Sequence, residues 1–106
     1  MIVATTETIA GYEITDNLGT VIGNTIRARH MGKDIMAGLR TIIGGEIKEY
    51  TGMLAESREQ SLMRMKDKAK ELGADAVVGV RFQTSMILSG TAELLVYGTA
   101  VKLGRK

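Results

Sequence analysis

The stretch of sequence that decides the fold is residues 44–80, which read GGEIKEYTGMLAESREQSLMRMKDKAKELGADAVVGV. Strong helix formers without proline or interior glycine run from Met53 to Leu72, which predicts one long helix. Thr51 can cap its amino end, and Gly73 stands where a left-handed carboxyl-terminal cap is expected. The partly alternating residues 74–86 that follow predict a strand with one face in the core.

Arg58 is the main anomaly of this helix, because it falls near the middle of the apolar side. An arginine in such a place is destabilising unless it is paired and hydrogen-bonded. Its planar fork of donors suits a carboxylate or carbonyl oxygens, and candidate partners precede the helix at Glu46, Glu49 and the Tyr50 hydroxyl. We favour a structural strut that pins this loop to the helix. An arginine that binds an anion in a cleft, or one at a subunit interface, remains open.

The amino-terminal third predicts a β-hairpin. Residues 9–15 and 20–26 read as strands, and Asp16-Asn17-Leu18-Gly19 between them has the composition of a turn. Asp34 can cap a short helix over residues 35–43, which Gly44 and Gly45 would end.

The last strand is predicted over residues 91–103, and its continuous apolar run Leu94-Leu95-Val96-Tyr97 is typical of a strand covered on both faces. We therefore predict a single two-layer α+β domain over residues 1–106, with the order β-β-α-α-β-β and a mostly antiparallel sheet. Because one long helix can cover only one face of the sheet, the other face must be covered by the short helix or by a second copy of the chain.

The composition of the chain limits the classes of function that it can have. The chain has 106 residues, a net charge of +2 and no cysteine. The absence of cysteine and of a signal-peptide layout leads us to expect a cytoplasmic protein, and no apolar run is long enough for a membrane span. Basic residues are interleaved with acidic ones and aromatic residues are few, so we expect no nucleic-acid partner.

The sequence contains few residues that could form a metal-binding or catalytic site. The only histidine is His30, with Asp34 four residues later, and this is too few ligands for a closed zinc site within one chain. Several copies of His30 could meet at a symmetry axis, although a surface histidine is the simpler interpretation. Any nucleophilic triad would also depend on His30. Gly44 and Gly45 lack the spacing of a phosphate-binding loop and are better explained as a helix end followed by a tight turn.

The sequence resembles the YbjQ-like family of small, uncharacterised bacterial proteins, whose descriptions carry heavy-metal binding as a label without established chemistry. The resemblance covers nearly the whole chain and rests on Gly44-Gly45, Tyr50, Leu54, Arg58, LGADAVVGV (72–80), SGTAE (89–93) and GTAVKL (98–103). It implies an α+β subunit that assembles into a ring, expected to be a pentamer.

Three functions follow from these observations. The first is a cytoplasmic ring-forming module that binds a small ligand or a metal ion between subunits. The second is a structural or protein-interaction ring without a ligand, in which Arg58 is fully used within the chain. The third is an enzyme with an intersubunit active site, for which no catalytic residue can be named.

Overall fold

The computed structural model describes residues 1–28, 48–88 and 91–106. Its elements are β1 (Ile2–Val3), β2 (Tyr12–Ala28), α2 (Lys48–Glu71), β3 (Ala76–Leu88) and β4 (Thr91–Arg105). The strands form one mixed sheet in the order β1-β3-β4-β2, in which only the pair of β1 and β3 is parallel. This confirms the predicted α+β class with a mostly antiparallel sheet. The predicted helix at 35–43 lies outside the described residues.

The predicted amino-terminal hairpin is wrong, because residues 12–28 form one long strand. The turn-like segment is an irregularity within β2, where the register against β4 shifts between Ile14 and Asp16 and again between Asn17 and Gly19. Gly19 has a φ of 106°, and its N–H donates to Asn17 Oδ1 at 3.0 Å. The hydrogen bond and the positive φ of an Asx turn are therefore present. They form a bulge within β2, and the strand continues alongside β4.

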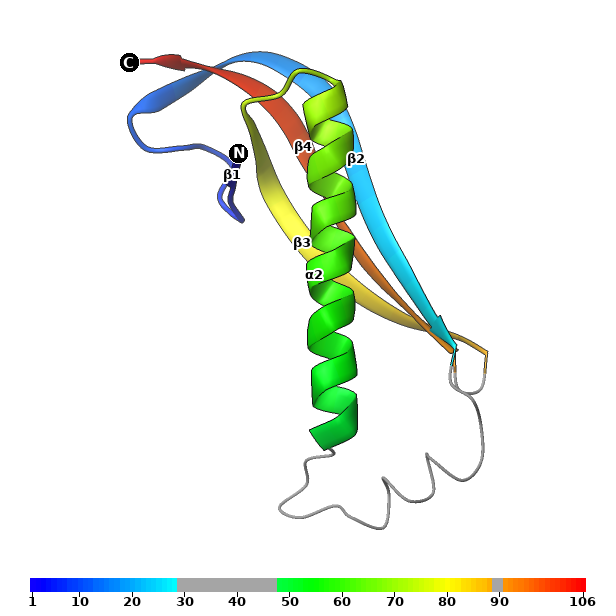
Figure 1. Ribbon diagram of the computed structural model, residues 1–106. Helices are drawn as coiled ribbons and strands as arrows, with labels where there is room; N and C mark the ends of the chain where they lie inside the picture. The colour runs from blue at the N-terminus through cyan, green and yellow to red at the C-terminus, as the bar shows by residue number, and fades with distance from the viewer. Residues whose placement is uncertain (29–47, 89–90) are drawn as a thin grey trace.

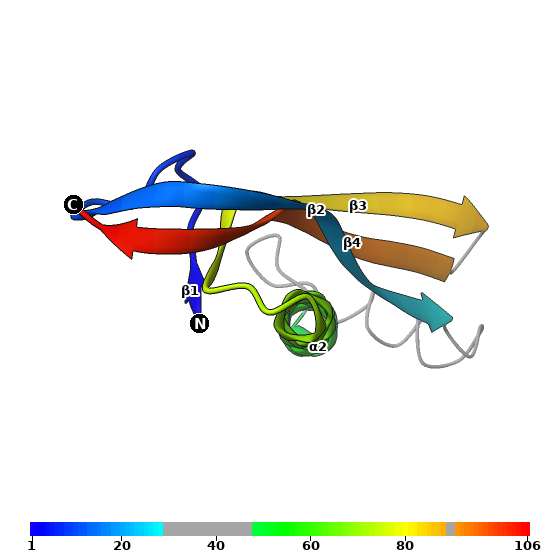
Figure 2. The ribbon, with the colours of Figure 1, turned by 90° about the horizontal axis from the view of Figure 1, so that it is seen from above.

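Helix α2 lies along one face of the sheet, over β2 and β4 (Figure 2). The core between helix and sheet consists of small and medium apolar side chains: Val21, Met65, Ala69, Val77, Val80, Val96 and Ala100. On the opposite face a smaller cluster of Ala76, Val78 and Val101 packs against Ile9 and Leu103. Among the described residues, cover on the face away from α2 is thus limited to one end.

A bulge in β3 sets which side chains of this strand face the helix. Gly79 has a φ of 62°, and the register against β4 shifts between Val78 and Arg81. Val77 and Val80 both belong to the helix-side core although they are three residues apart. An unbroken strand would direct these two side chains to opposite faces.

The ends of α2 differ in how well the sequence predicts them. The helix begins at Lys48, so Thr51 lies within it and is not its cap. At the other end Gly73 has a φ of 77°, its N–H donates to Lys70 O at 2.9 Å, and the N–H of Ala74 donates to Ala69 O at 3.0 Å. This pair of hydrogen bonds is a Schellman motif, in which glycine adopts the left-handed conformation without strain.

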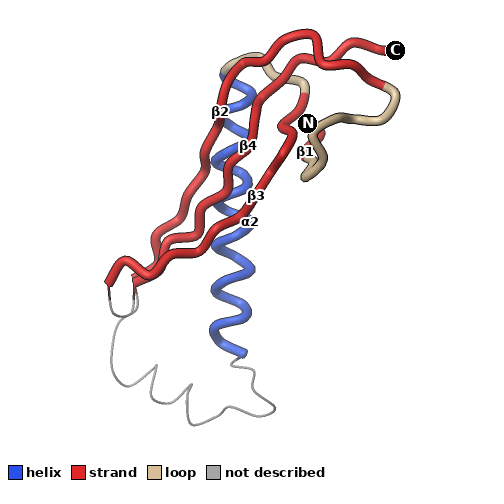
Figure 3. Tube along the Cα trace, turned by 180° about the vertical axis from the view of Figure 1, so that it is seen from behind, coloured by secondary structure: helices blue, strands red, loops and turns tan. Residues whose placement is uncertain are grey.

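The subunit is elongated, with principal extents of 55 × 25 × 16 Å. Figures 1 and 3 show that the sheet curves away from α2 toward the amino-terminal half of the helix, so that helix and strands diverge there. Among the described residues, no helix is long and apolar enough to cross a membrane.

Candidate functional site

Helix and strand are closely packed at the seam between α2 and β2. Ser57, Ser61, Met65 and Ala69 are fully buried along one side of the helix, and Gly23 of β2 lies directly beneath them. A Cβ atom built at Gly23 would overlap the Ser61 carbonyl oxygen and lie 2.5 Å from Met65 N. The helix backbone therefore approaches the strand as closely as it does only because Gly23 has no side chain.

Hydroxyl groups inside this seam are satisfied by one another and by the backbone. Ser61 Oγ lies 2.9 Å from Thr25 Oγ1 and 3.0 Å from Leu94 O. Ser57 Oγ donates to Met53 O at 2.9 Å. No buried side-chain polar atom in the described part of the chain lacks a hydrogen-bond partner, so these groups hold the helix on the sheet and leave no donor for a ligand.

Two arginines close the outer side of the seam. Arg27 Nε donates to Ser57 Oγ at 2.8 Å and its Nη2 donates to Gln60 Oε1 at 3.2 Å. Arg64 Nη1 donates to the backbone oxygen of Asn24 at 2.7 Å. Sequence analysis missed these residues. The signal that could have found them is the pair of serines, four residues apart on the sheet side of a helix, together with a glycine in the middle of a strand.

Arg58 is exposed, although the helical periodicity places it near the middle of the apolar side of α2. The adjacent Ser57 is fully buried and accepts a hydrogen bond from Arg27 of β2, so α2 still contacts the sheet here, but the Arg58 side chain is not part of that contact. No hydrogen bond joins Arg58 to another described residue. Since α2 begins at Lys48, the Cα atoms of Glu49 and Tyr50 lie about 12–13.5 Å from that of Arg58 along the helix axis. The strut prediction stays a prediction, because Glu46 and the side chains of Glu49 and Tyr50 lie outside what the structure describes.

The remaining predicted site residues are not brought together. His30, Gly44 and Gly45 lie outside the described residues. Within residues 1–28, 48–88 and 91–106, no three histidine, cysteine, aspartate or glutamate side chains are grouped as metal ligands would be. The chain also has no cysteine, the ligand that soft metals prefer. The described residues therefore do not fit a heavy-metal centre.

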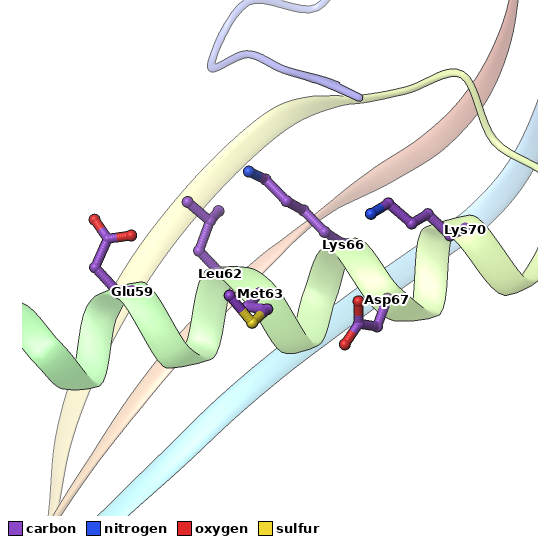
Figure 4. A pocket seen from close by; sticks show the side chains of 6 residues that line it. All are labelled: Glu59, Leu62, Met63, Lys66, Asp67 and Lys70. Atoms are coloured by element: carbon purple, nitrogen blue, oxygen red, sulfur yellow. The ribbon is translucent and has the colours of Figure 1, made fainter.

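A shallow hollow of about 280 Å³ lies on the solvent side of α2. Among the residues that line it, Figure 4 shows Glu59, Leu62 and Lys66 projecting to one side of the helix, whereas Met63 and Asp67 project to the other. A second hollow of about 290 Å³ lies nearer β2, between Arg27 and Met63. Both are open and lined by charges of mixed sign, unlike the enclosed, mostly apolar pockets that bind small molecules. They fit a contact surface better than a substrate pocket.

Comparison with known proteins identifies the relatives of this chain. The model of the YbjQ family, described as "Putative heavy-metal-binding", matches residues 1–104. A UPF0145 protein of Methanosarcina acetivorans is 60% identical over 103 residues, which is 97% of each chain. A UPF0145 protein of Psychromonas ingrahamii is 56% identical over 97% of this chain and 98% of its own. Relatives therefore occur in archaea as well as bacteria, so the bacterial restriction expected from the resemblance is not supported.

The fold also occurs in a crystal structure of a protein of unknown function from Pediococcus pentosaceus, assigned to the DUF74 family. The two structures superpose with a TM-score of 0.66 over 98% of each chain, at 19% sequence identity. This likeness establishes the fold alone. With the family model matched along nearly the whole chain and close relatives at 55–60% identity, the protein belongs to the YbjQ family.

Proposed function

We propose that the protein is the subunit of a homo-oligomeric ring, expected to be a pentamer, and that self-assembly is the basis of its function. The observation that carries this proposal is the shape of the single subunit. Its radius of gyration is 17.3 Å, whereas a compact domain of this length has about 13 Å. A chain with these proportions has much of its surface available for contact with other copies.

The exposed surface supports the same proposal. The chain exposes 7089 Å², about 1,300 Å² more than a compact chain of its mass, 11.4 kDa, would expose. A stable interface buries roughly 800 Å² on each partner, and a ring subunit has two such interfaces. Large apolar side chains contribute to the excess: Ile26 is 56% and Met86 69% exposed.

A second candidate function, the binding of a small anion between subunits, is favoured by Arg58. This guanidinium is exposed and has no hydrogen-bond partner among the described residues. Arginine binds carboxylate and phosphate groups through two parallel hydrogen bonds. An anionic ligand is therefore a better match to the described residues than a metal ion. A metal site remains a prediction for His30 and its symmetry mates.

The assembly is tested by native mass spectrometry and light scattering on protein purified without added metal, with elemental analysis of the same sample. We expect one closed oligomer with the mass of a pentamer. A monomer at micromolar concentration would overturn the ring. A fixed stoichiometry of metal would revive the metal interpretation and direct attention to His30.

The anion site is tested by thermal unfolding with sodium phosphate or citrate, compared with sodium chloride at equal ionic strength. A ligand at 100 times its Kd stabilises the folded state by about 2.7 kcal/mol. We expect the stabilisation to be lost in Arg58→Gln and kept in Lys68→Gln, which removes one exposed positive charge from the same helix. Equal loss in both variants would indicate nonspecific screening and refute the site. The cytoplasmic location stays a prediction from the cysteine-free composition.

A further inference from the structure

The described sheet has two unpaired edges. β2 is the outermost strand on one side, because the strand order is β1-β3-β4-β2. On the other side, the chain after β1 covers only the beginning of β3: the N–H of Gly79 donates to Thr6 O at 2.8 Å and that of Val80 to Ala4 O at 3.0 Å. Beyond Val80, β3 has no strand next to its outer edge in the described part of the chain.

The register shows which backbone groups of β4 face which neighbour. In an antiparallel sheet, successive residues direct their N–H and C=O groups to opposite sides of the strand. The N–H of Asp75 donates to Val101 O at 2.9 Å, and the N–H of Leu103 donates to Asp75 Oδ2 at 2.9 Å. The odd-numbered residues of β4 therefore face β3 and the even-numbered residues face β2. The β2 partners of the even-numbered residues are Val21, Gly23 and Thr25.

The alternate residues of the outer strands direct their backbone groups away from the sheet. On β2 these residues are Ile22, Asn24 and Ile26. The bond from Arg64 Nη1 to Asn24 O agrees with this assignment, because a side chain outside the sheet reaches that oxygen. On β3, Arg81, Gln83 and Ser85 pair with odd-numbered residues of β4. The outward residues of β3 are consequently Phe82, Thr84 and Met86.

We propose that the outer edge of β3, residues 82–86, pairs with the outer edge of β2, residues 22–26, of the next copy of the chain. This inference rests on the proposed ring and specifies how the ring is joined. β2 and β3 both run antiparallel to β4, so they run in the same direction and their pairing between rotated copies is a parallel ladder. Two different edges in contact make a heterologous interface, which gives a ring when the rotation between successive copies closes.

The side chains along the two edges fit this arrangement. Phe82 and Met86 are exposed on the helix side of the sheet, and Ile22 and Ile26 are exposed on the opposite side. A neighbouring strand would cover apolar surface on both faces at once. The Arg64 contact is compatible with pairing, because a carbonyl oxygen has two lone pairs and Asn24 O can accept from the neighbour as well. Arg64 then protects this edge before assembly, as charged groups do on other edge strands.

The first test substitutes proline at alternate positions of β3. Thr84→Pro removes an outward N–H and leaves the bonds to β4 intact, as proline does on edge strands. We expect a folded monomer, with the far-UV spectrum retained and the mass reduced from the ring to 11.4 kDa. Thr84→Ala should keep the ring. Gln83→Pro removes a donor that faces β4 and should unfold the subunit. A Thr84→Pro protein with the mass of the wild type would overturn the edge pairing.

The second test uses engineered cysteines, because the natural chain has none. Gln83→Cys is combined with Ile22→Cys or with Ile26→Cys, all on the face away from α2. Within one chain β4 separates these positions by two strand spacings, about 9.5 Å or more, too far for a disulfide, which needs Cα atoms within about 7 Å. Disulfides can therefore form only between copies.

The outcomes separate this inference from the ring itself. Oxidation should give a covalent ladder up to the full ring for a double variant and no ladder for either single variant. Dimers from Gln83→Cys alone would indicate like edges in contact and refute the heterologous pairing. A wild-type ring with neither a ladder nor a response to Thr84→Pro would refute the edge pairing and leave the ring standing. A monomeric wild type would refute both.

Discussion

Gly23→Ala tests whether the seam between α2 and β2 depends on the absence of one methyl group. The added Cβ would overlap the Ser61 carbonyl oxygen and lie 2.5 Å from Met65 N and 3.0 Å from Met65 Cβ. These obstacles are mostly helix backbone, so no side-chain rotation can make room. The whole helix must move away from β2, which weakens the packing of Met65 and the hydrogen bonds of Ser61 to Thr25 and Leu94.

Overpacking a core typically costs 1–3 kcal/mol, and the rigid obstacle places this substitution at the upper end, about 3 kcal/mol. For a domain of this size, that loss lowers Tm by roughly 12–24 °C. The assay is thermal unfolding by circular dichroism at a fixed protein concentration, because assembly makes Tm depend on concentration.

Gly52→Ala is the matched control for this prediction. Gly52 lies in α2, and a Cβ there would meet nothing within 4 Å. Replacement of a helical glycine by alanine stabilises a helix by about 0.8–1 kcal/mol, so we expect a small rise in Tm. An unchanged Tm in Gly23→Ala, with the control behaving as expected, would refute the close approach of helix and strand.

Three further substitutions address single contacts. Gly73→Ala should lower the free energy of unfolding by about 1 kcal/mol, because a left-handed residue with a Cβ is strained; urea denaturation would measure this, and no loss would argue against the Schellman cap. Ser61→Ala should cost about 1–3 kcal/mol, since the buried Thr25 hydroxyl loses its partner; a neutral result in the same titration would mean that water replaces the hydroxyl. Arg27→Met should cost about 1.5–3 kcal/mol through the lost charged hydrogen bond to Ser57; hydrogen exchange should show faster opening of the first half of α2, and unchanged protection there would contradict the role assigned to Arg27.

Local pattern predicted the long helix and the last two strands, and all three extend close to their predicted ranges. The hairpin failed for a physical reason. Asn17 and Gly19 make the hydrogen bond and the positive φ of a turn, yet the same geometry serves a bulge when a long partner strand continues alongside. Whether β4 continues alongside is decided by contacts about 80 residues away in sequence, which no local pattern contains.

The environment of Arg58 shows a second limit of sequence reasoning. A helical wheel places Arg58 near the middle of the apolar side of α2, which predicts burial. Arg58 is nevertheless exposed, next to the fully buried Ser57, in the half of α2 from which the sheet curves away (Figure 1). Curvature arises from twist and bulges accumulated over whole strands, so exposure along α2 could not be derived from the periodicity of the helix.

The bulge at Gly79 reverses the alternation of side chains between the two faces of β3. Before it, even-numbered side chains of β3 point away from α2; after it, even-numbered side chains point toward α2. Deletion of this one residue would exchange the two faces of the distal half of the strand. Arg81 and Gln83 would then point to the helix side, and Phe82 and Met86 to the open face. The presence of one extra residue between Val78 and Val80 therefore decides which side chains of β3 lie on each face of the sheet. For the surface in contact with a neighbouring copy, this spacing is as important as the identity of the side chains.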